Sequence, residues 1–180
     1  IVGHPFNPVY LIPLVEVVAG QQTSAEVVEW LSAFYRSIGK KPVICEAETT
    51  GFIANRLQEA LFRESLHMVD AGEATAEQID DVMRFGPGLR WAFMGPFLTY
   101  HLAGGRGGMR RFFESFGDTL TLPYSRLEAP PLSNELIGKV IRQCDDAYRL
   151  YSSDDLENWR DRNIRTLTRE LRSLEDLSAS

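Results

Sequence analysis

A histidine and a glutamate lie near the start of the chain, each in a short apolar run of residues. His4 ends the run Ile1–His4, and Glu16 lies inside the run Leu14–Val18. If the two runs pair as neighbouring strands, the carboxylate can bind one ring nitrogen and leave the other free to accept a proton. The pattern therefore predicts a general base, His4, that is oriented by Glu16. The alternative is a core histidine and an edge glutamate in an ordinary sheet, although a charged residue inside a buried run needs a polar partner.

A further polar candidate is Asn55, which lies in the segment Thr49–Arg56 at the start of a predicted helix. Gly51, four residues earlier, would let another backbone or a ligand approach closely. The asparagine amide offers both a donor and an acceptor to such a ligand. An ordinary solvated asparagine in the first turn of a helix is the alternative.

An arginine occurs among aromatic residues in the Gly- and Pro-containing segment Gly86–Phe97. Arg90 could hold a carboxylate, while the ring faces of Trp91 and Phe93, with Tyr100 further along, could receive a cation. The competing interpretation places the aromatic residues in the core and Arg90 in a surface ion pair. The segment, which we predict to be a loop, is therefore a candidate substrate clamp.

Residues 1–48 contain the elements that would position the histidine and the glutamate. The predicted strands are Ile1–His4, Leu14–Val18 and Val43–Cys45. Between the last two, apolar residues at helical spacing predict a helix that follows the capping candidates Thr23 and Ser24 and ends at Gly39. This order is typical of the closing part of a doubly wound, Rossmann-type α/β sheet.

Residues 49–180 carry a helical pattern throughout. The predicted helices are Phe52–Val69, Ala76–Phe85, Pro96–Leu102, Met109–Phe116, Ser133–Tyr151 and Asp154 to about Leu174. The fold class is therefore mainly α, with the last strands and helix of a Rossmann-type domain followed by an all-helical domain. Long amphipathic helices such as the first are expected to pack against a second copy of the chain.

The charge and cysteine content exclude several classes of function. The net charge is −6, and basic residues are interleaved with acidic ones, as in Arg160-Asp161-Arg162, so no patch for nucleic acid forms. The two cysteines, Cys45 and Cys144, lack metal-site spacing, which predicts no bound metal and fits a reducing, cytoplasmic compartment. No apolar run reaches the roughly 18 residues that a membrane span needs, so we expect no membrane partner.

A dinucleotide-binding sheet needs a glycine-rich turn for the pyrophosphate, and this chain lacks one. The stretch Gly104–Gly108 follows a predicted helix and does not have the spacing G-x-G-x-x-G, so we interpret it as a connector between helices. The chain also begins inside a predicted strand, and we interpret Ile1 as a truncation point. Residues that bind a cofactor would then lie mostly upstream of Ile1.

Four segments together resemble one enzyme superfamily. They are His4–Pro8, Leu14–Val18, Gly51–Arg56 and Met94–Phe97. In order and spacing they resemble the 3-hydroxyacyl-CoA dehydrogenase superfamily, in which an NAD-binding domain precedes a helical C-terminal domain. The resemblance implies an NAD-dependent oxidation of a CH–OH group and a homodimer formed through the helical domain. It also implies that His4 is the general base, that Glu16 orients it, and that Asn55 hydrogen-bonds near the reacting oxygen.

Further segments point to a substrate within the superfamily. They are Leu61–His67, Gly88–Gly95, Phe97–Gly105 and Gly108–Arg110. They resemble the members that act on L-carnitine, which carries a carboxylate, a hydroxyl and a trimethylammonium group. Arg90 would then bind the carboxylate, and Trp91, Phe93 and Tyr100 would surround a cation that has no N–H to donate.

Alternatives to this function stay open. The alternative substrates are L-gulonate and a 3-hydroxyacyl-CoA, on which other enzymes of the same superfamily act. A non-catalytic helical module for dimerisation is the alternative of a different class. Whichever substrate an enzyme of this kind uses, residues 1–180 alone are expected to be inactive, because the cofactor site would lie largely outside them.

Overall fold

The computed structural model describes residues 1–92, 94–121, 133–148, 150 and 152–174. These residues form two compact units. The first comprises Ile1–Ala60 with Glu157–Thr166, and the second comprises the described residues of 61–156 and 167–174. The fold is mainly α with one small sheet, as the sequence predicts.

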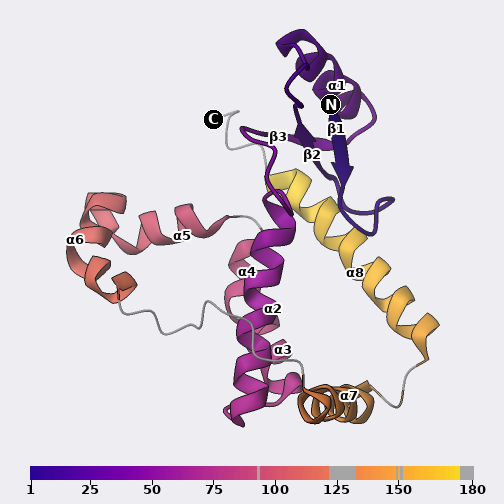
Figure 1. The fold of residues 1–180 in the computed structure, drawn as a ribbon, viewed down its shortest axis with the longest axis vertical. Coiled ribbons are helices and arrows are strands. Elements are labelled where there is room, and N and C mark those ends of the chain that lie inside the picture. Colours follow the sequence, from indigo (N-terminus) through magenta and orange to yellow (C-terminus); the bar gives the residue numbers. More distant parts are fainter. Residues whose placement is uncertain (93, 122–132, 149, 151, 175–180) are drawn as a thin grey trace. The chain divides into compact units, whose positions relative to one another are not determined.

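A three-stranded sheet forms the centre of the first unit (Figure 1). Its strands are β1 (Val2–Pro5), β2 (Leu14–Val18) and β3 (Lys41–Cys45), in the order β1-β2-β3. β1 pairs with β2 antiparallel, and β2 pairs with β3 in parallel. The parallel pair needs a crossover connection, which helix α1 (Ala25–Ser37) supplies. The predicted strands and helix of this part are therefore confirmed.

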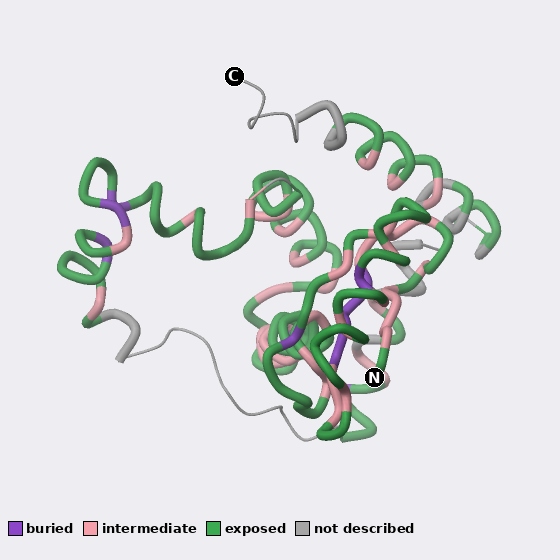
Figure 2. Tube along the Cα trace, turned by 90° about the horizontal axis from the view of Figure 1, so that it is seen from above, coloured by how far each residue is buried: buried purple, intermediate pink, exposed green. Residues whose placement is uncertain are grey.

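The middle strand carries most of the buried residues of the first unit. Val15, Val17 and Val18 of β2 are at most 1% exposed, and Glu16 is buried among them. Figure 2 shows how few residues are buried elsewhere in the described chain. Because Glu16 is buried, its charged side chain must find its partners within the protein.

Helix α1 packs closely on β1 at a glycine. A Cβ on Gly3 would lie 2.4 Å from the hydroxyl oxygen of Tyr35, so no larger residue fits there without moving that ring. Of the two N-cap candidates, Thr23 and Ser24, it is Ser24 that occupies the N-cap position of α1, with extended backbone, although its side chain makes no capping hydrogen bond. The helix ends at Ser37, two residues before Gly39, which has the positive φ of a residue that terminates a helix.

The remaining described elements are helical. They are α2 (Ala54–Ala71), α3 (Ala76–Phe85), α4 (Pro87–Trp91), α5 (Pro96–Ala103), the 3-10 turn η1 (Gly105–Gly107), α6 (Gly108–Thr121), α7 (Asn134–Tyr148) and α8 (Ser153–Leu174). Helix α3 begins with a capping box, in which the Thr75 side chain and the Gln78 side chain each accept from the other residue's backbone N–H. None of the helices within the described residues has the length and apolar character needed to cross a bilayer.

Two sequence predictions about these helices are wrong in detail. The segment Gly86–Phe97 is not all loop, because Pro87 opens the short helix α4, and proline is well suited to a first helical position. Helix α2 starts at Ala54 instead of Phe52, because Gly51 and Phe52 both have positive φ and form a turn before it. This second difference concerns the candidate site directly.

Within the second unit, three close contacts join helices. Along the hairpin of α5 and α6, a Cβ on Gly108 would lie 2.5 Å from the ring of His101, so the glycine permits the approach. Gln143 of α7 accepts a hydrogen bond of 3.0 Å from the first backbone N–H of α3 at Ala76. Lys139 of α7 donates to the carbonyl of Val69 near the end of α2.

Candidate active site

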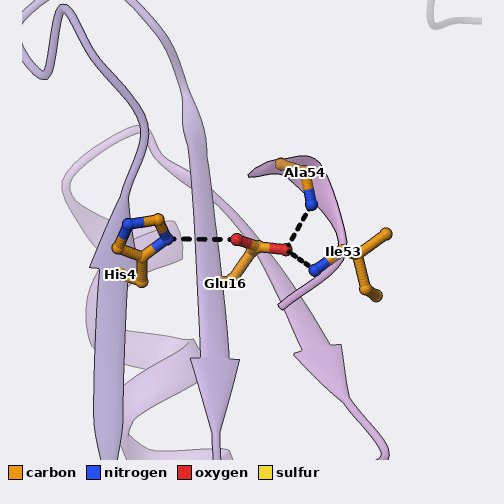
Figure 3. Close-up of polar contacts among 4 residues, drawn as sticks. All are labelled: His4, Glu16, Ile53 and Ala54. Carbon is orange, nitrogen blue, oxygen red and sulfur yellow. Dashed lines mark hydrogen bonds and ion pairs between the residues drawn. The ribbon is translucent and has the colours of Figure 1, made fainter. Parts of the chain in front are cut away.

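His4 and Glu16 lie directly opposite each other in the antiparallel pair of β1 and β2. The His4 Nδ1 and the Glu16 Oε2 are 3.1 Å apart, which is hydrogen-bonding distance (Figure 3). The His4 side chain is 31% exposed, whereas the Glu16 side chain is 2% exposed. The structure therefore brings the two residues into contact, with the carboxylate inside the protein and the imidazole reaching the surface.

The second carboxylate oxygen of Glu16 binds the start of helix α2. The backbone N–H groups of Ile53 and Ala54 donate to Glu16 Oε1 over 2.8 Å and 2.9 Å. These N–H groups lie at the helix N-terminus, where they lack intrahelical partners and where a negative charge is favoured. Both oxygens of the buried carboxylate are thus satisfied, which offsets the cost of burying its charge.

The pKa of Glu16 is set by opposing effects. Burial raises the pKa, but the hydrogen bonds from the Ala54 N–H, His4 and the Ile53 N–H outweigh burial, so the pKa lies below its ordinary value. Glu16 is therefore ionised at neutral pH. Burial and the same carboxylate raise the pKa of the nearby Cys45 thiol, which stays protonated.

The ionised carboxylate determines which nitrogen of His4 carries the proton. A carboxylate without a proton can only accept, so in the neutral imidazole Nδ1 must carry the hydrogen that is donated to Glu16. Nε2 then has a free lone pair, and in Figure 3 this second nitrogen points away from Glu16. The pair can therefore remove a proton from a group placed beside Nε2 and stabilise the resulting imidazolium.

A residue that the sequence analysis did not single out also contacts the histidine. The rings of His4 and Phe52 lie edge to face, with centroids 5.3 Å apart and an interplanar angle of 63°. Phe52 has a φ of 46°, and Gly51 before it has a φ of 77°. The only available sequence signal is Gly51, because Ile53 and Ala54 act through backbone N–H groups that every residue except proline carries.

The other predicted site residues have different surroundings. Asn55 directly follows Ala54, is exposed, and makes no hydrogen bond to His4 or Glu16 within the described residues. Arg90 and Trp91 are exposed on α4, and Phe93 lies outside the described residues. Tyr100, on α5, is 50% exposed, and its ring centroid lies 4.8 Å from that of Phe112. Of the predicted site residues in the first unit, His4 and Glu16 are in contact, while Arg90, Trp91 and Tyr100 belong to the second unit.

We expect the stabilisation from Glu16 to be present at neutral pH and to disappear in acid. Its folded-state pKa is lowered, and the unfolded chain has a glutamate pKa of about 4.3. Between the two values the unfolded state binds more protons, so the free energy of unfolding rises with pH. Urea unfolding of the wild-type chain and of Glu16→Gln should therefore show a stability difference that shrinks as the pH falls below about 4.

Glu29→Gln is the control for this measurement, because it removes an exposed carboxylate that pairs with Arg36 at 3.0 Å. A stability difference between wild type and Glu16→Gln that stays the same from neutral to acid pH would contradict the assignment of a lowered pKa to Glu16.

The fold and site define a mainly α protein in which the end of a Rossmann-type sheet, with a carboxylate-oriented histidine, precedes a helical domain. Two family models match this chain. The model for the 3-hydroxyacyl-CoA dehydrogenase NAD binding domain matches residues 1–49, and the model for the C-terminal domain of the same family matches residues 51–139. The chain belongs to the 3-hydroxyacyl-CoA dehydrogenase family, as the sequence segments predict.

Curated relatives include several L-carnitine dehydrogenases. The chain is 50% identical over 180 residues to that of Nocardiopsis dassonvillei, covering 100% of this chain and 55% of the relative. It is 55% identical over 164 residues to that of Streptomyces coelicolor, covering 91% and 52%. The chain therefore spans about half the length of the curated relatives that it matches.

A solved structure shows the same arrangement of elements. It is 5-formyl-3-hydroxy-2-methylpyridine 4-carboxylic acid 5-dehydrogenase, described as an NAD+-dependent dismutase. The match has a TM-score of 0.75 and 26% identity, and it covers 94% of this chain and 55% of that one. Within the described residues of the present chain, no cluster of three or more His, Cys, Asp or Glu could hold a metal ion.

Proposed function

We propose that this chain supplies the proton-accepting half of an NAD-dependent L-carnitine dehydrogenase, which oxidises the 3-hydroxyl of L-carnitine to 3-dehydrocarnitine. The observation that carries the proposal is the contact between His4 and a buried Glu16 that is held by the start of α2. We further propose that residues 1–48 are the end of the NAD-binding domain and that residues 49–180 bind the substrate and a second subunit.

The proposed proton step follows from the tautomer of His4. Nε2 accepts the proton of the substrate hydroxyl, and the imidazolium is stabilised by the ionised Glu16 through Nδ1–H. When the O–H bond breaks, its electron pair forms the new carbonyl bond as the hydride leaves the carbon. NAD, when bound, supplies the acceptor for that hydride. Asn55, in the first turn of α2, would hydrogen-bond near the same oxygen.

The NAD site itself would lie largely outside this chain. The connection between β2 and α1 contains a single glycine, Gly20, and not the G-x-G-x-x-G turn that seats a pyrophosphate at a helix start. The present residues therefore do not fit the phosphates of the cofactor, and we assign them only the proton step.

Two arguments support L-carnitine as the substrate: the similarity of this chain to curated relatives and the chemistry of its candidate substrate-binding side chains. The L-carnitine dehydrogenases named above are 50% and 55% identical to this chain. Arg90, exposed on α4, would bind the carboxylate, since a guanidinium can pair with both of its oxygens. Trp91 and Tyr100, with Phe93, would receive the trimethylammonium group on their ring faces. A 3-hydroxyacyl-CoA carries neither of these two groups on its acyl chain.

The proposal is tested with a chimaera in which the part of the Streptomyces coelicolor relative that this chain does not match precedes Ile1. NADH formation is followed with L-carnitine, L-gulonate and a 3-hydroxyacyl-CoA. We expect the highest kcat/KM with L-carnitine. A higher value with either of the other substrates would overturn the substrate assignment, and no turnover with any of them, in a folded chimaera that binds NAD, would favour a non-catalytic module.

Arg90→Gln is expected to raise the KM for L-carnitine in this chimaera by about tenfold to 100-fold, because a charge-assisted hydrogen bond contributes roughly 1.5–3 kcal/mol. Arg84→Gln is the matched control, since Arg84 is exposed on the preceding helix α3 and pairs with Asp81. Equal effects of the two substitutions on KM would contradict the proposed role of Arg90.

We also propose that the helical domain forms a homodimer and that the enzyme is cytoplasmic. Large apolar side chains on α5 and α6 support the homodimer. Phe97 is 81% exposed and Phe113 is 53% exposed in the isolated chain, and a partner subunit would cover such side chains.

The proposed cytoplasmic location is supported by the cysteines. The chain has two of them, widely separated in the sequence, which suggests a reducing compartment.

A further inference from the structure

Residues 52–54 form one short turn that contacts both members of the His4–Glu16 pair. Phe52 packs its ring against the imidazole at 5.3 Å between centroids. The next two residues, Ile53 and Ala54, donate their N–H groups to the Glu16 oxygen that His4 does not use. The histidine thus contacts both an aromatic ring and a carboxylate that is itself held in place (Figure 3 shows the carboxylate).

The backbone of this turn is unusual at Phe52. With a φ of 46°, Phe52 is the only residue other than glycine with a positive φ in the part of the chain that the structure describes. A side chain with a Cβ is disfavoured in this region, where glycine or asparagine is usual. Residues held in such conformations are concentrated at functional sites, where the surrounding structure maintains them.

The conformation of this turn does not require a side chain at position 52. Gly51, with a φ of 77°, and the hydrogen bond from the Phe52 N–H to the Thr49 carbonyl at 3.1 Å set the direction of the turn. Glycine at position 52 would accept the same backbone without strain but would leave the imidazole without its ring contact. The presence of phenylalanine here is therefore explained by its ring.

We propose that Phe52 is a positioning residue for the general base: its ring keeps the imidazole of His4 in the orientation in which Nδ1 donates to Glu16 and Nε2 is free. This inference rests on the proposed function, because orientation of Nε2 matters only if that nitrogen accepts the substrate proton. The Phe52 ring contacts the imidazole of His4, whereas Glu16 is bound by the backbone N–H groups of Ile53 and Ala54, so the role assigned to the ring is exerted on the histidine.

The first test reads the tautomer of His4 directly, by ¹⁵N NMR of the ring nitrogens in the present chain. The chain has three histidines, and the His4 signals are identified by their absence in His4→Asn. We expect a protonated Nδ1 and an unprotonated Nε2 in the wild-type chain. Phe52→Leu and Phe52→Gly should both convert this to a mixture of tautomers, whereas Phe52→Tyr, which keeps the ring, should preserve it.

The second test measures kinetics in the chimaera. Phe52→Leu should lower kcat by about tenfold to 100-fold, because misplacement of a reacting group by about 1 Å has effects of this size, and should leave the KM for L-carnitine within about twofold. Phe52→Tyr should restore kcat. Leu57→Ala is the matched control, since Leu57 is an apolar residue of α2 that is 57% exposed.

The outcomes separate this inference from the proposed function. If Phe52→Gly, which relieves the backbone, keeps the wild-type tautomer and kcat, the ring is not required and the inference is overturned. If Phe52→Leu does not fold, Phe52→Met takes its place in both measurements, with the same expected losses. Full activity of His4→Asn would overturn the proposed function instead, while the NMR result on Phe52 would still report what holds the imidazole.

Discussion

Replacing His4 with asparagine lowers kcat for L-carnitine oxidation in the chimaera by about 100-fold to 10,000-fold, the usual contribution of a positioned general base. Asparagine is chosen because its amide nitrogen can take the place of Nδ1. It can still donate to Glu16 Oε2, 3.1 Å from the original nitrogen, so the buried carboxylate is not left without a partner. What the substitution removes is Nε2, the atom that accepts the proton.

His67→Asn serves as the control for losing a histidine elsewhere on the chain. A His4→Asn rate close to wild type would show that another group is the base.

The contact between His4 and Glu16 could be predicted because it depends on a pattern of side-chain types. Two short β-branched runs predict paired strands, and a charged residue in a buried run requires a polar partner. The antiparallel register that places the two residues opposite each other supplies that partner. The contact was predictable because an unpaired buried charge costs free energy. In the structure, Glu16 has His4 as its partner.

The partners of the second carboxylate oxygen could not be predicted, because they are backbone N–H groups. Ile53 and Ala54 carry apolar side chains, and nothing in their types indicates a bond to Glu16. Phe52 was predicted as the first residue of a helix because it continues an apolar periodicity. Periodicity describes side-chain spacing and contains no information on a left-handed turn, which here depends on the contacts of the folded chain.

The segment around Arg90 shows a different limit. Glycine and proline on both sides predicted a loop, yet proline at the first position of a helix is favourable and α4 forms there. The substrate-binding roles of Arg90, Trp91 and Tyr100 remain predictions, because the fold does not determine what these exposed side chains bind. A buried charge is constrained by the fold, whereas an exposed cation and exposed rings are constrained only by what binds to them.

Glu16 connects the base to the helix, and two substitutions of Glu16 should separate these roles. Glu16→Ala removes every acceptor, so the N–H groups of Ile53 and Ala54 and the Nδ1–H of His4 lose their partner. We expect the free energy of unfolding to fall by about 2–4 kcal/mol, since charge-assisted hydrogen bonds contribute roughly 1.5–3 kcal/mol each and water can replace part of the loss. Urea unfolding of the chain measures this fall.

Glu16→Gln should instead lose less stability than Glu16→Ala and should lose the activity. Its carbonyl oxygen can still accept from the start of α2, but its NH₂ group then faces His4 and donates to Nδ1. Nδ1 must therefore give up its hydrogen, and Nε2 becomes protonated and unable to act as a base. In hydrolase triads the equivalent change from carboxylate to amide lowers kcat by about 10,000-fold, and we expect a loss of similar order in the chimaera.

The two Glu16 variants together distinguish an electrostatic role from a structural one. If Glu16 only held α2 in place, the rate in Glu16→Gln would follow its stability and remain high. If Glu16 determines the tautomer, the rate is lost while the fold is kept, and ¹⁵N NMR shows the hydrogen of His4 moved to Nε2. A folded and fully active Glu16→Gln would contradict the dyad, because an amide cannot both bind the N–H groups of α2 and accept from Nδ1 with its other end.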